Sequence, residues 1–339
     1  MNKKKRHHFI PKAYLRAFCD DSEKVLVYRK DTPDQVLKLD PDNIAHQRYY
    51  YSQPRPDGGV DNNALEDVFC EIEAVWPLIV QALRREGDVA DQFEDLLQFM
   101  ALQRVRVPAC RDAIEAQLAA VVKAQMLMLK SAGKLPAEPE GFEGLLDQVQ
   151  VTIDPHHSIH AMVDLITASG AFFRRLGFMA VRNETSVPFL TSDNPVMWFA
   201  PDVPDEELQP YVVRPDGPAM LLFPVSPDLL IIGSTEHGEE FLRSGLQYGA
   251  VADVEWVGRV NRQTCRFAYT MVFARDAGQE ELIRTHAHES PILATDRLPV
   301  EGGGTFLLSR MVFGPRPAKP KWVQRMDETP AVAVGDSDR

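Results

Sequence analysis

A change in hydrophobic periodicity near residue 177 constrains the fold more than any other feature of this 339-residue chain. Between residues 62 and 177, apolar residues recur every three or four positions, as they do in amphipathic helices. From residue 178 to residue 314, apolar segments such as AMLLFPVS (219–226) and LLIIGS (229–234) have the length of strands. A regular alternation of strand and helix, which a doubly wound parallel sheet requires, is missing. The pattern therefore predicts an α+β fold.

Two further strand-like segments precede the helical block. KVLVYRK (24–30) alternates and is rich in valine, and QVLKLD (35–40) follows it after the turn sequence DTPD. We expect the helical block, residues 62–177, to pack on a mainly antiparallel sheet formed from both N- and C-terminal segments. Residues 1–314 are predicted to form a single domain. The tail 315–339 is rich in proline, alanine and charge and is predicted to be disordered.

Prolines, caps and periodicity divide the chain into predicted elements. Pro77 should kink the first long helix, and Pro108 should end the second. The predicted helices cover residues 62–86, 89–107, 109–133, 143–150, 154–177, 251–267 and 278–287. The predicted strands that follow the helical block cover residues 178–184, 187–193, 196–199, 219–226, 229–234, 270–276 and 304–314.

Charge and hydropathy limit the partners. A formal net charge of −12 disfavours binding to nucleic acid or to an anionic membrane over the whole surface. KKKR (3–6) is the best candidate for a local basic groove, and a solvated terminus is the alternative. No apolar run approaches the ~18 residues of a membrane span, and the N-terminus lacks the apolar core of a signal peptide. We therefore expect a cytoplasmic protein with no membrane partner.

The sequence marks neither a metal site nor a cofactor. Cys19, Cys70, Cys110 and Cys265 have no C-x-x-C spacing and are predicted to be free thiols in a reducing compartment. In DPHHSIH (154–160), two histidines have the i, i+4 spacing of helical zinc ligands, but the glutamate that follows the first histidine in zinc proteases is missing. A surface histidine cluster is favoured over a metal site. Phosphate-binding and dinucleotide-binding glycine motifs are missing too, which disfavours nucleoside triphosphate hydrolysis.

Polar residues within apolar surroundings identify a candidate site. His7 and His8 precede a short helix (11–18), so that one imidazole can face a pocket, or both belong to a solvated tail. Glu66 and Glu73 share one face of the first long helix, although an acid in the first turn also suits the helix dipole.

The segment LQRVRVP (102–108) places polar residues on a buried helix face. Gln103 and Arg106 have i, i+3 spacing there, and a buried arginine requires a carboxylate or a phosphate-like ligand. The alternative is a structural ion pair with Glu66, Glu73 or Asp193. Whether Arg104 or Arg106 faces the site stays open.

The segment FLTSDNPV (189–196) carries Asp193 and Asn194 at the end of an apolar strand, where many folds place functional side chains. The same residues also favour a turn for local reasons. FPVSPD (223–228) either lines the same site or forms only a hairpin turn.

One hypothesis assigns chemical roles to these residues. An imidazole oriented by a carboxylate serves as general acid or base, and arginine and amide groups hold an anionic substrate. The predicted catalytic residues are His7, His8, Glu66 and Asp193. The predicted substrate-binding residues are Gln103, Arg104, Arg106, Asn194 and Tyr14. The expected activity is hydrolysis of a phosphoester, and a nucleic acid is one candidate substrate.

Two alternatives stand beside this hypothesis. In the first, the protein is not an enzyme, and the same residues form a buried polar network that joins the helical block to the sheet. In the second, the protein binds a nucleic acid or a small ligand, such as a phosphate-containing one, without turnover. The sequence identifies no cofactor and no oligomeric state.

The order of these segments resembles a bacterial family of proteins, domain of unknown function 4238. The resembling segments are HHFIPKAYLRAF, RYYYS, ALEDVFCEIE, QRVRVP, TSDNPV and FPVSP, which span about residues 7–270. QRVRVP carries two arginines, so either can fill the arginine position of the family pattern. The resemblance implies a fold shared with that family and a bacterial or phage-related origin in the cytoplasm. It implies no particular activity.

Overall fold

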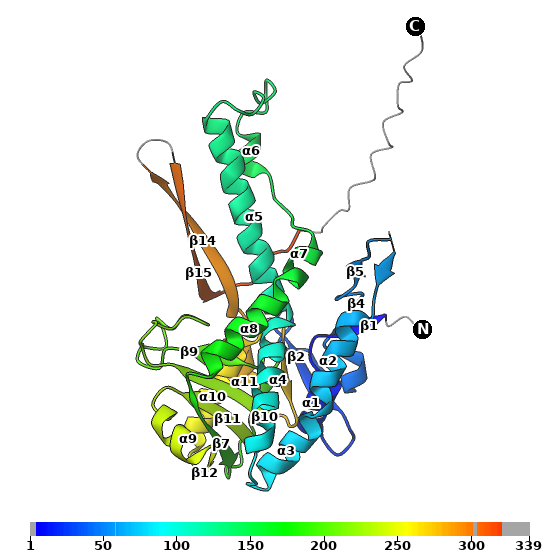
Figure 1. Ribbon diagram of the computed structural model, residues 1–339, viewed down its shortest axis with the longest axis vertical. Coiled ribbons are helices and arrows are strands. Elements are labelled where there is room, and N and C mark those ends of the chain that lie inside the picture. Colours follow the sequence, from blue (N-terminus) through cyan, green and yellow to red (C-terminus); the bar gives the residue numbers. More distant parts are fainter. Residues whose placement is uncertain (1–4, 58, 301–303, 321–339) are drawn as a thin grey trace.

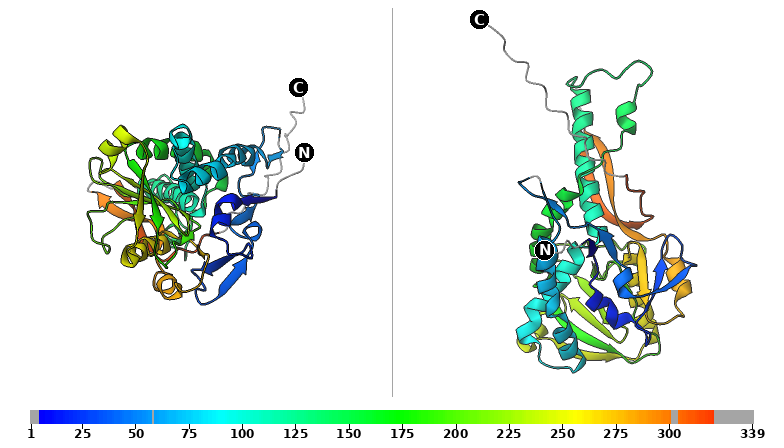
Figure 2. Two further views of the ribbon diagram at one scale, coloured as in Figure 1. Left: turned by 90° about the horizontal axis from the view of Figure 1, so that it is seen from below. Right: turned by 90° about the vertical axis from the view of Figure 1, so that its right-hand side faces the viewer.

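The computed structural model describes residues 5–57, 59–300 and 304–320. A helical layer covers two separate β-sheets, and one long helix and one hairpin project from this body (Figures 1 and 2). The mainly antiparallel sheets and the helices confirm the predicted α+β class.

The larger sheet has the strand order β12-β7-β11-β10-β9. Its β7–β11, β11–β10 and β10–β9 pairs are antiparallel, whereas β12 runs parallel to β7. Its strands are β7 (Gly177–Asn183), β9 (Met197–Phe199), β10 (Met220–Ser226), β11 (Leu229–Ser234) and β12 (Gln247–Val251). As predicted, β10 and β11 form a hairpin with Pro227 and Asp228 at its turn.

Both faces of this sheet are buried, which explains why β10 and β11 are continuously apolar. Side chains alternate between faces along a strand. Phe223 of β10 therefore packs against Trp76 and Phe99 of the helical block, whereas its neighbour Leu222 packs into a second cluster with Val257.

The smaller sheet joins the two ends of the chain. Its order is β3-β2-β13-β8, so β2 (Val25–Arg29) pairs with β13 (Met271–Ala274). The other two strands are β3 (Val36–Leu39) and β8 (Thr191–Ser192). The prediction of a sheet formed from both N- and C-terminal segments is confirmed, with the strands divided over two sheets.

The helical block follows the predicted order. Around Pro77, the predicted helix 62–86 divides into α2 and α3 at Val75, and the predicted helix 154–177 divides at Ala161. The helices are α1 (Lys12–Leu15), α2 (Ala64–Ala74), α3 (Trp76–Arg84), α4 (Phe93–Val105), α5 (Pro108–Ser131), α6 (Leu145–Gln148), α7 (Pro155–His160) and α8 (Met162–Phe173). The 3-10 turns are η1 (Arg16–Phe18), η2 (Pro41–Asn43) and η3 (Ala90–Gln92).

Several predictions for individual elements were wrong. The strand predicted at 187–193 is reduced to β8, because Leu190 N–H donates at 2.9 Å to the side chain of Asn261 instead of to a strand. The helix predicted at 251–267 begins later, as α10 (Val254–Phe267), because the Asp253 side chain caps it. β12 and α9 (Gly238–Ser244) were not predicted.

The remaining elements are short, apart from one hairpin. β14 (Ser290–Val300), which was not predicted, pairs along its length with β15 (Gly304–Gly314). The others are β1 (Arg6–His8), which pairs with β4 (His46–Arg48), β5 (Gln53–Pro54), which pairs with β6 (Val60–Asp61), and α11 (Glu280–Thr285).

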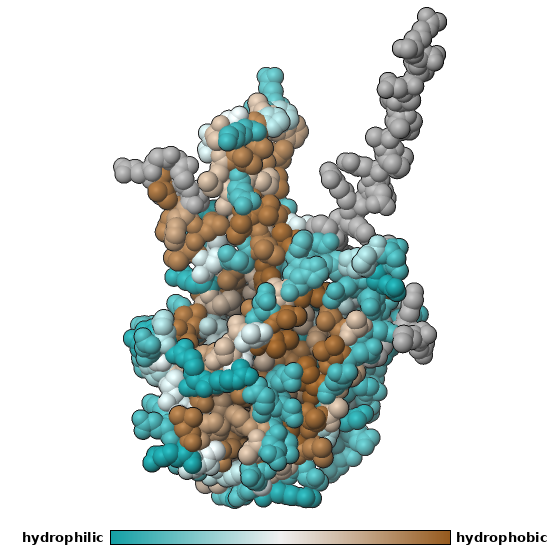
Figure 3. Space-filling view, viewed as in Figure 1, coloured by the Kyte–Doolittle hydropathy of each residue, from teal (hydrophilic) through white to brown (hydrophobic). Residues whose placement is uncertain are grey.

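The β14–β15 hairpin and the distal half of α5 project side by side (Figures 1 and 2). Figure 3 shows that hydrophobic residues gather along this projecting part of α5. Leu118, Val122 and Met128 are among its exposed apolar residues. Among the described helices, none is long and apolar enough to cross a membrane.

The predictions for the two chain ends, a basic groove at residues 3–6 and a disordered tail at residues 315–339, fall partly outside the described residues. Lys3 and Lys4 of the predicted basic groove lie outside them. Residues 315–320 of the predicted tail have no helix or strand, yet Lys319 forms ion pairs with Asp112 and Glu115 of α5. Residues 321–339 lie outside the described part.

Candidate functional site

His7 is a buried acceptor of a backbone hydrogen bond. Its strand, β1, pairs with β4, so that His7 and His8 point to opposite sides of the chain. The backbone N–H of Tyr51 donates to His7 Nδ1 at 2.8 Å, and the two rings stack with centroids 5.7 Å apart. The imidazole therefore holds the RYYYS segment in place and has no exposed surface.

His8 is a half-buried, neutral imidazole. Its ring contacts the ring of His46 edge-on, with centroids 5.2 Å apart, and its Nε2 is buried without a hydrogen-bond partner. Burial, together with the charges of His46, Lys12 and Arg106, lowers the pKa of His8 to about 4. At neutral pH this histidine carries no charge.

Arg106 forms the structural ion pair that was one of the predicted alternatives. Its guanidinium binds the Glu73 carboxylate and the backbone carbonyl of His8. Its own carbonyl accepts a hydrogen bond from the Tyr51 hydroxyl at 2.8 Å. Arg106 thus connects β1, α2 and the end of α4.

We call His7, His8, Glu66, Glu73, Arg106 and Tyr51 the Tyr51 group. Glu66 lies buried on α2, and its charge adds to the burial that raises the pKa of Tyr51 to about 12. Three predicted catalytic residues, namely His7, His8 and Glu66, thus belong to this group.

Tyr14 joins the N-terminal segment to both sheets. Its hydroxyl donates to the carbonyl of Pro224 in β10 at 2.6 Å and lies 2.6 Å from Thr191 Oγ1 in β8. Its ring stacks on Phe223 with centroids 5.5 Å apart. Tyr14 was predicted to bind substrate. In the structure it is fully buried, and its contacts hold the N-terminal segment against β8 and β10.

Asp193 is fully buried and is held by backbone donors. Its Oδ1 accepts from the N–H of Tyr269 at 2.7 Å, and its Oδ2 accepts from the N–H of Thr270 at 2.8 Å and from the Thr270 hydroxyl. Burial raises the pKa of Asp193, although these hydrogen bonds oppose the shift. The carboxylate fixes the chain at the entry to β13.

Arg104 faces a different environment from Arg106. Its guanidinium carbon lies 3.7 Å from the ring centroid of Tyr211 and 5.3 Å from that of Trp198. The residue is 8% exposed, and its Nε and Nη1 are buried without hydrogen-bond partners. Within the described residues, no carboxylate oxygen lies within 4.0 Å of this guanidinium.

Asn194 contacts the same tyrosine. Its Nδ2 donates to the Tyr211 hydroxyl at 2.5 Å and to the carbonyl of Phe267 at 2.7 Å, while its buried Oδ1 has no partner. We call Arg104, Asn194, Trp198 and Tyr211 the Arg104 site. Burial raises the pKa of Tyr211 to about 12. The charge of Asp193 acts in the same direction, whereas the charge of Arg104 opposes the shift.

Gln103 adds two more unsatisfied polar atoms on α4. It is fully buried, and neither its Nε2 nor its Oε1 has a hydrogen-bond partner in the part of the chain that the structure describes. The structure thus places some predicted residues in the Tyr51 group (His7, His8, Glu66 and Arg106) and others in the Arg104 site (Arg104 and Asn194). Tyr14, Gln103 and Asp193 belong to neither of them.

The residues of the Tyr51 group and the Arg104 site that the sequence did not predict are aromatic. Tyr51 stands in the RYYYS segment, which belongs to the family resemblance, so a signal for it existed. Tyr211 and Trp198 have no such signal, because Tyr211 lies in the irregular segment 200–219 between β9 and β10. Their contact with Arg104 could not be predicted, because the sequence does not show which of the two arginines, Arg104 or Arg106, faces them.

Histidine, cysteine, aspartate and glutamate side chains are the usual protein ligands of metal ions. Among those that the structure describes, no group of three or more histidine, cysteine, aspartate or glutamate side chains is arranged to hold a metal ion. Within the described residues, Cys19, Cys110 and Cys265 are thiols that form no disulfide bond.

Comparison with known proteins identifies the family. No curated protein and no solved structure matches the chain significantly. A family model described as "Protein of unknown function (DUF4238)" matches residues 6–278, a range that contains both the Tyr51 group and the Arg104 site. The chain therefore belongs to the DUF4238 family.

Proposed function

We propose that this protein binds a small anionic ligand at the Arg104 site. One observation carries the proposal: the Arg104 guanidinium is buried, and two of its nitrogens donate no hydrogen bond to any described residue. Burial of a charged donor without an acceptor costs roughly several kcal/mol, so a buried arginine is normally paired with an anionic group. The fork of an arginine suits the two oxygens of a carboxylate or phosphate.

Other buried arginines of the chain support this argument by contrast. Arg106 binds Glu73 and the carbonyl of His8. Arg111 donates to Ser158 at 3.0 Å, to the carbonyl of Tyr50 at 2.7 Å and to that of Pro155 at 2.9 Å. Arg104 has aromatic contacts in place of acceptors. Stacking on a ring stabilises the cation but leaves its N–H donors for another partner.

The backbone of Tyr211 supports a functional role as well. Its φ angle is 65°, in the left-handed region that bulky side chains rarely adopt. Such strain costs about 1–3 kcal/mol and is concentrated at functional sites. The segment that carries it, 200–219, is an irregular connection of the length that often covers a binding site. Tyr211 thus closes over Arg104 at an energetic cost.

The predicted hydrolysis of a phosphoester stays a prediction. A general base must reach the attacking group within hydrogen-bond distance. Asp193 has both carboxylate oxygens engaged by Tyr269 and Thr270, so the contacts around it favour a supporting role for this residue. The bacterial origin and the cytoplasmic location likewise stay predictions.

Isothermal titration calorimetry with inorganic phosphate and with succinate tests the binding proposal. The folded wild-type chain should bind one of these anions, and Arg104→Gln should weaken that binding at least about tenfold, or about 1.4 kcal/mol. Arg104→Lys should restore only part of the affinity, because it keeps the charge without the fork. Arg174→Gln, which alters an exposed arginine of the helical block, is the matched control.

Equal affinity in Arg104→Gln, or absence of binding to the folded wild type up to about 10 mM of either anion, would contradict the proposal. Turnover of bis(p-nitrophenyl) phosphate should be assayed with the same variants. Turnover that disappears in Arg104→Gln would add hydrolysis to binding at this site.

A further inference from the structure

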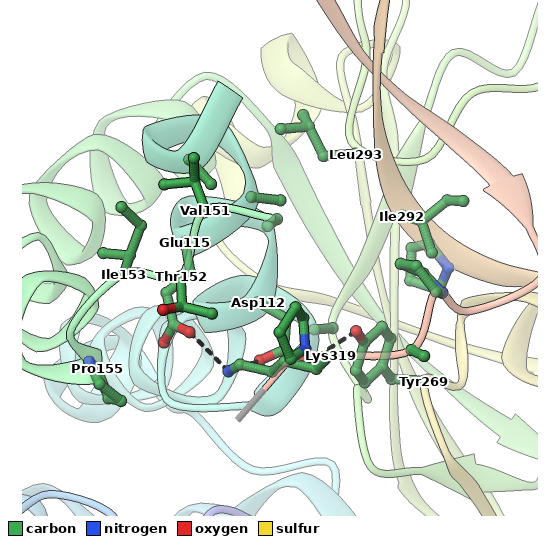
Figure 4. A pocket seen from close by; sticks show the side chains of 18 of the residues that line it. Asp112, Glu115, Val151, Thr152, Ile153, Pro155, Tyr269, Ile292, Leu293 and Lys319 are labelled. Atoms are coloured by element: carbon green, nitrogen blue, oxygen red, sulfur yellow. Dashed lines mark hydrogen bonds and ion pairs between the residues drawn. The ribbon is translucent and has the colours of Figure 1, made fainter. Parts of the chain in front are cut away.

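A second site lies apart from all the predicted residues. It is a cavity of about 500 Å³ between α5, the segment before α7, the start of β14 and residues 317–320 (Figure 4). Cavities of roughly 300–1,000 Å³ are typical of small-molecule sites. None of the residues of the Tyr51 group or of the Arg104 site lines it.

Most of the cavity wall is apolar. Ala109, Ala113 and Ala116 have i, i+4, i+7 spacing on α5 and line one side, where their small side chains leave room. Val151 and Ile292 belong to the other sides. An aliphatic body would fill this volume and lose its contact with water, which is favourable by about 25 cal/mol for each Å² buried.

One end of the cavity carries two carboxylates that already hold an ammonium group. Lys319 Nζ lies 2.6 Å from Asp112 Oδ1 and 2.7 Å from Glu115 Oε2. Figure 4 shows Lys319 reaching between these two side chains. Burial opposes the charge of Lys319, but the two carboxylates raise its pKa.

Both carboxylates are oriented from outside α5. The other oxygen of Asp112 accepts from the Tyr269 hydroxyl at 2.9 Å, and the other oxygen of Glu115 accepts from the Ser158 hydroxyl at 2.9 Å. Each acid therefore presents one oxygen to the ammonium group. Such preorganisation lowers the cost of binding a cation there.

Nearby arginines leave this charge arrangement intact. Arg111 donates to Ser158 and to two backbone carbonyls, so it meets Glu115 only through the serine. The guanidinium carbon of Arg316 lies over Tyr269, 5.5 Å from the ring centroid. The ion pairs that Asp112 and Glu115 form within the described chain are both with Lys319.

Lys319 is the replaceable partner in this arrangement. Its side chain is 48% exposed, whereas that of Glu115 is 8% exposed. It stands in a segment without helix or strand, so few contacts hold it compared with the acids on α5.

We propose that this cavity binds an aliphatic amine, whose ammonium group takes the position of the Lys319 ammonium between Asp112 and Glu115. The Lys319 side chain then acts as an internal competitor that the amine displaces into solvent. The proposal is independent of anion binding at the Arg104 site.

Competition predicts how affinity changes when Lys319 is removed. The apparent dissociation constant equals the intrinsic one divided by the fraction of molecules in which the site is free. If Lys319 occupies the acids about nine-tenths of the time, Lys319→Ala should bind an amine about tenfold more tightly.

Calorimetry on the full chain with n-hexylamine, and with n-hexanol as its neutral analogue, tests the proposal. The wild type should bind hexylamine, and Lys319→Ala should bind it about tenfold more tightly. Hexanol should bind to Lys319→Ala at least about tenfold more weakly than hexylamine, because it lacks the charge. Lys130→Ala is the matched control, because Lys130 lies at the far end of α5 and pairs with Glu138. This variant should bind hexylamine like the wild type.

Two variants test the two ends of the cavity. Asp112→Asn should weaken hexylamine binding at least about tenfold, as should Ala116→Leu, which fills the apolar part and keeps both acids. Thermal melts show whether each variant is folded. If one of them is unfolded, the affinity of the other, folded variant for hexylamine is the test. Arg104→Gln should bind hexylamine like the wild type, so failure of anion binding leaves this test intact.

The proposal is overturned if Lys319→Ala binds hexylamine no more tightly than the wild type does. It is also overturned if hexanol binds as tightly as hexylamine, or if folded Asp112→Asn and Ala116→Leu both keep wild-type affinity.

Discussion

The carboxylate of Asp193 accepts a hydrogen bond from the backbone N–H of Thr270 at 2.8 Å, and the same side chain also accepts from the N–H of Tyr269 at 2.7 Å. One buried side chain thus satisfies two consecutive backbone donors at the entry to β13. The contact joins the Ser-Asp-Asn-Pro segment to the strand that pairs with β2, and hence to the N-terminal part of the chain.

Asp193→Ala should destabilise the protein strongly. Each of the two N–H groups that loses its acceptor costs about 1–3 kcal/mol, so the variant should lose about 2–6 kcal/mol of unfolding free energy. Urea unfolding monitored by circular dichroism measures the loss. Asp276→Ala, which alters an exposed aspartate that pairs with the exposed Arg275, is a control in which little change is expected. A stable Asp193→Ala protein would refute the structural role of this carboxylate.

Removal of Arg106 should have a comparable effect. Arg106→Ala leaves the carbonyl of His8 and the carboxylate of Glu73 without their donor, and breaking a buried pair typically costs about 3–5 kcal/mol. The exposed pair Arg174–Glu94 of the same helical block should contribute less than about 1 kcal/mol. A double-mutant cycle for each pair compares the two, and equal coupling energies would contradict the structural assignment.

Tyr14→Phe isolates the hydroxyl that joins α1 to both sheets. The ring should keep its stacking on Phe223, while the bonds to Thr191 and to the Pro224 carbonyl are lost. Because the carbonyl is left buried and unpaired, we expect a loss of about 1–3 kcal/mol in unfolding free energy. Thr191→Val tests the other partner. If the losses of the two single variants simply add in the double variant, the hydroxyls do not interact.

The stability of the folded state should depend on His8 at mildly acidic pH. The folded pKa of about 4 lies below the ordinary histidine pKa of 6.5, so between these values the unfolded chain binds a proton that the folded chain does not. Unfolding free energy should therefore fall as pH falls from about 6.5 to about 4. Because His8 is only half-buried, we expect about 1–2 kcal/mol in total, less than the full shift implies.

An NMR titration of the His8 ring checks this prediction directly, and His8→Gln should flatten the fall in unfolding free energy. His46, Lys12 and Arg106 all act against protonation of this ring, whereas a hydrogen bond involving the Asp42 backbone favours it. A His8 resonance that titrates near pH 6.5 would show that these neighbours do not act as described.

Much of the fold could be predicted from the sequence because its signals are local. The β10–β11 hairpin follows from two apolar runs and a Pro-Asp turn, and the break before α3 follows from Pro77. β12 was missed because it is stabilised by parallel pairing with β7, a distant partner. β14 was missed because its alternating pattern is interrupted by prolines, and its partner β15 supplies the hydrogen bonds.

By itself, the sequence determined which residues are polar within apolar surroundings, and hence which side chains have to find partners when they are buried. It did not determine the partners. Arg104 and Arg106 stand two positions apart at the end of α4, so they point in different directions. The packing of α2 and of the segment 200–219 decided that Arg106 meets Glu73 and that Arg104 meets Tyr211. The position of Lys319 between Asp112 and Glu115 is likewise a contact between segments distant in sequence. Such contacts depend on how whole elements pack, and a local pattern of residues carries no information about them.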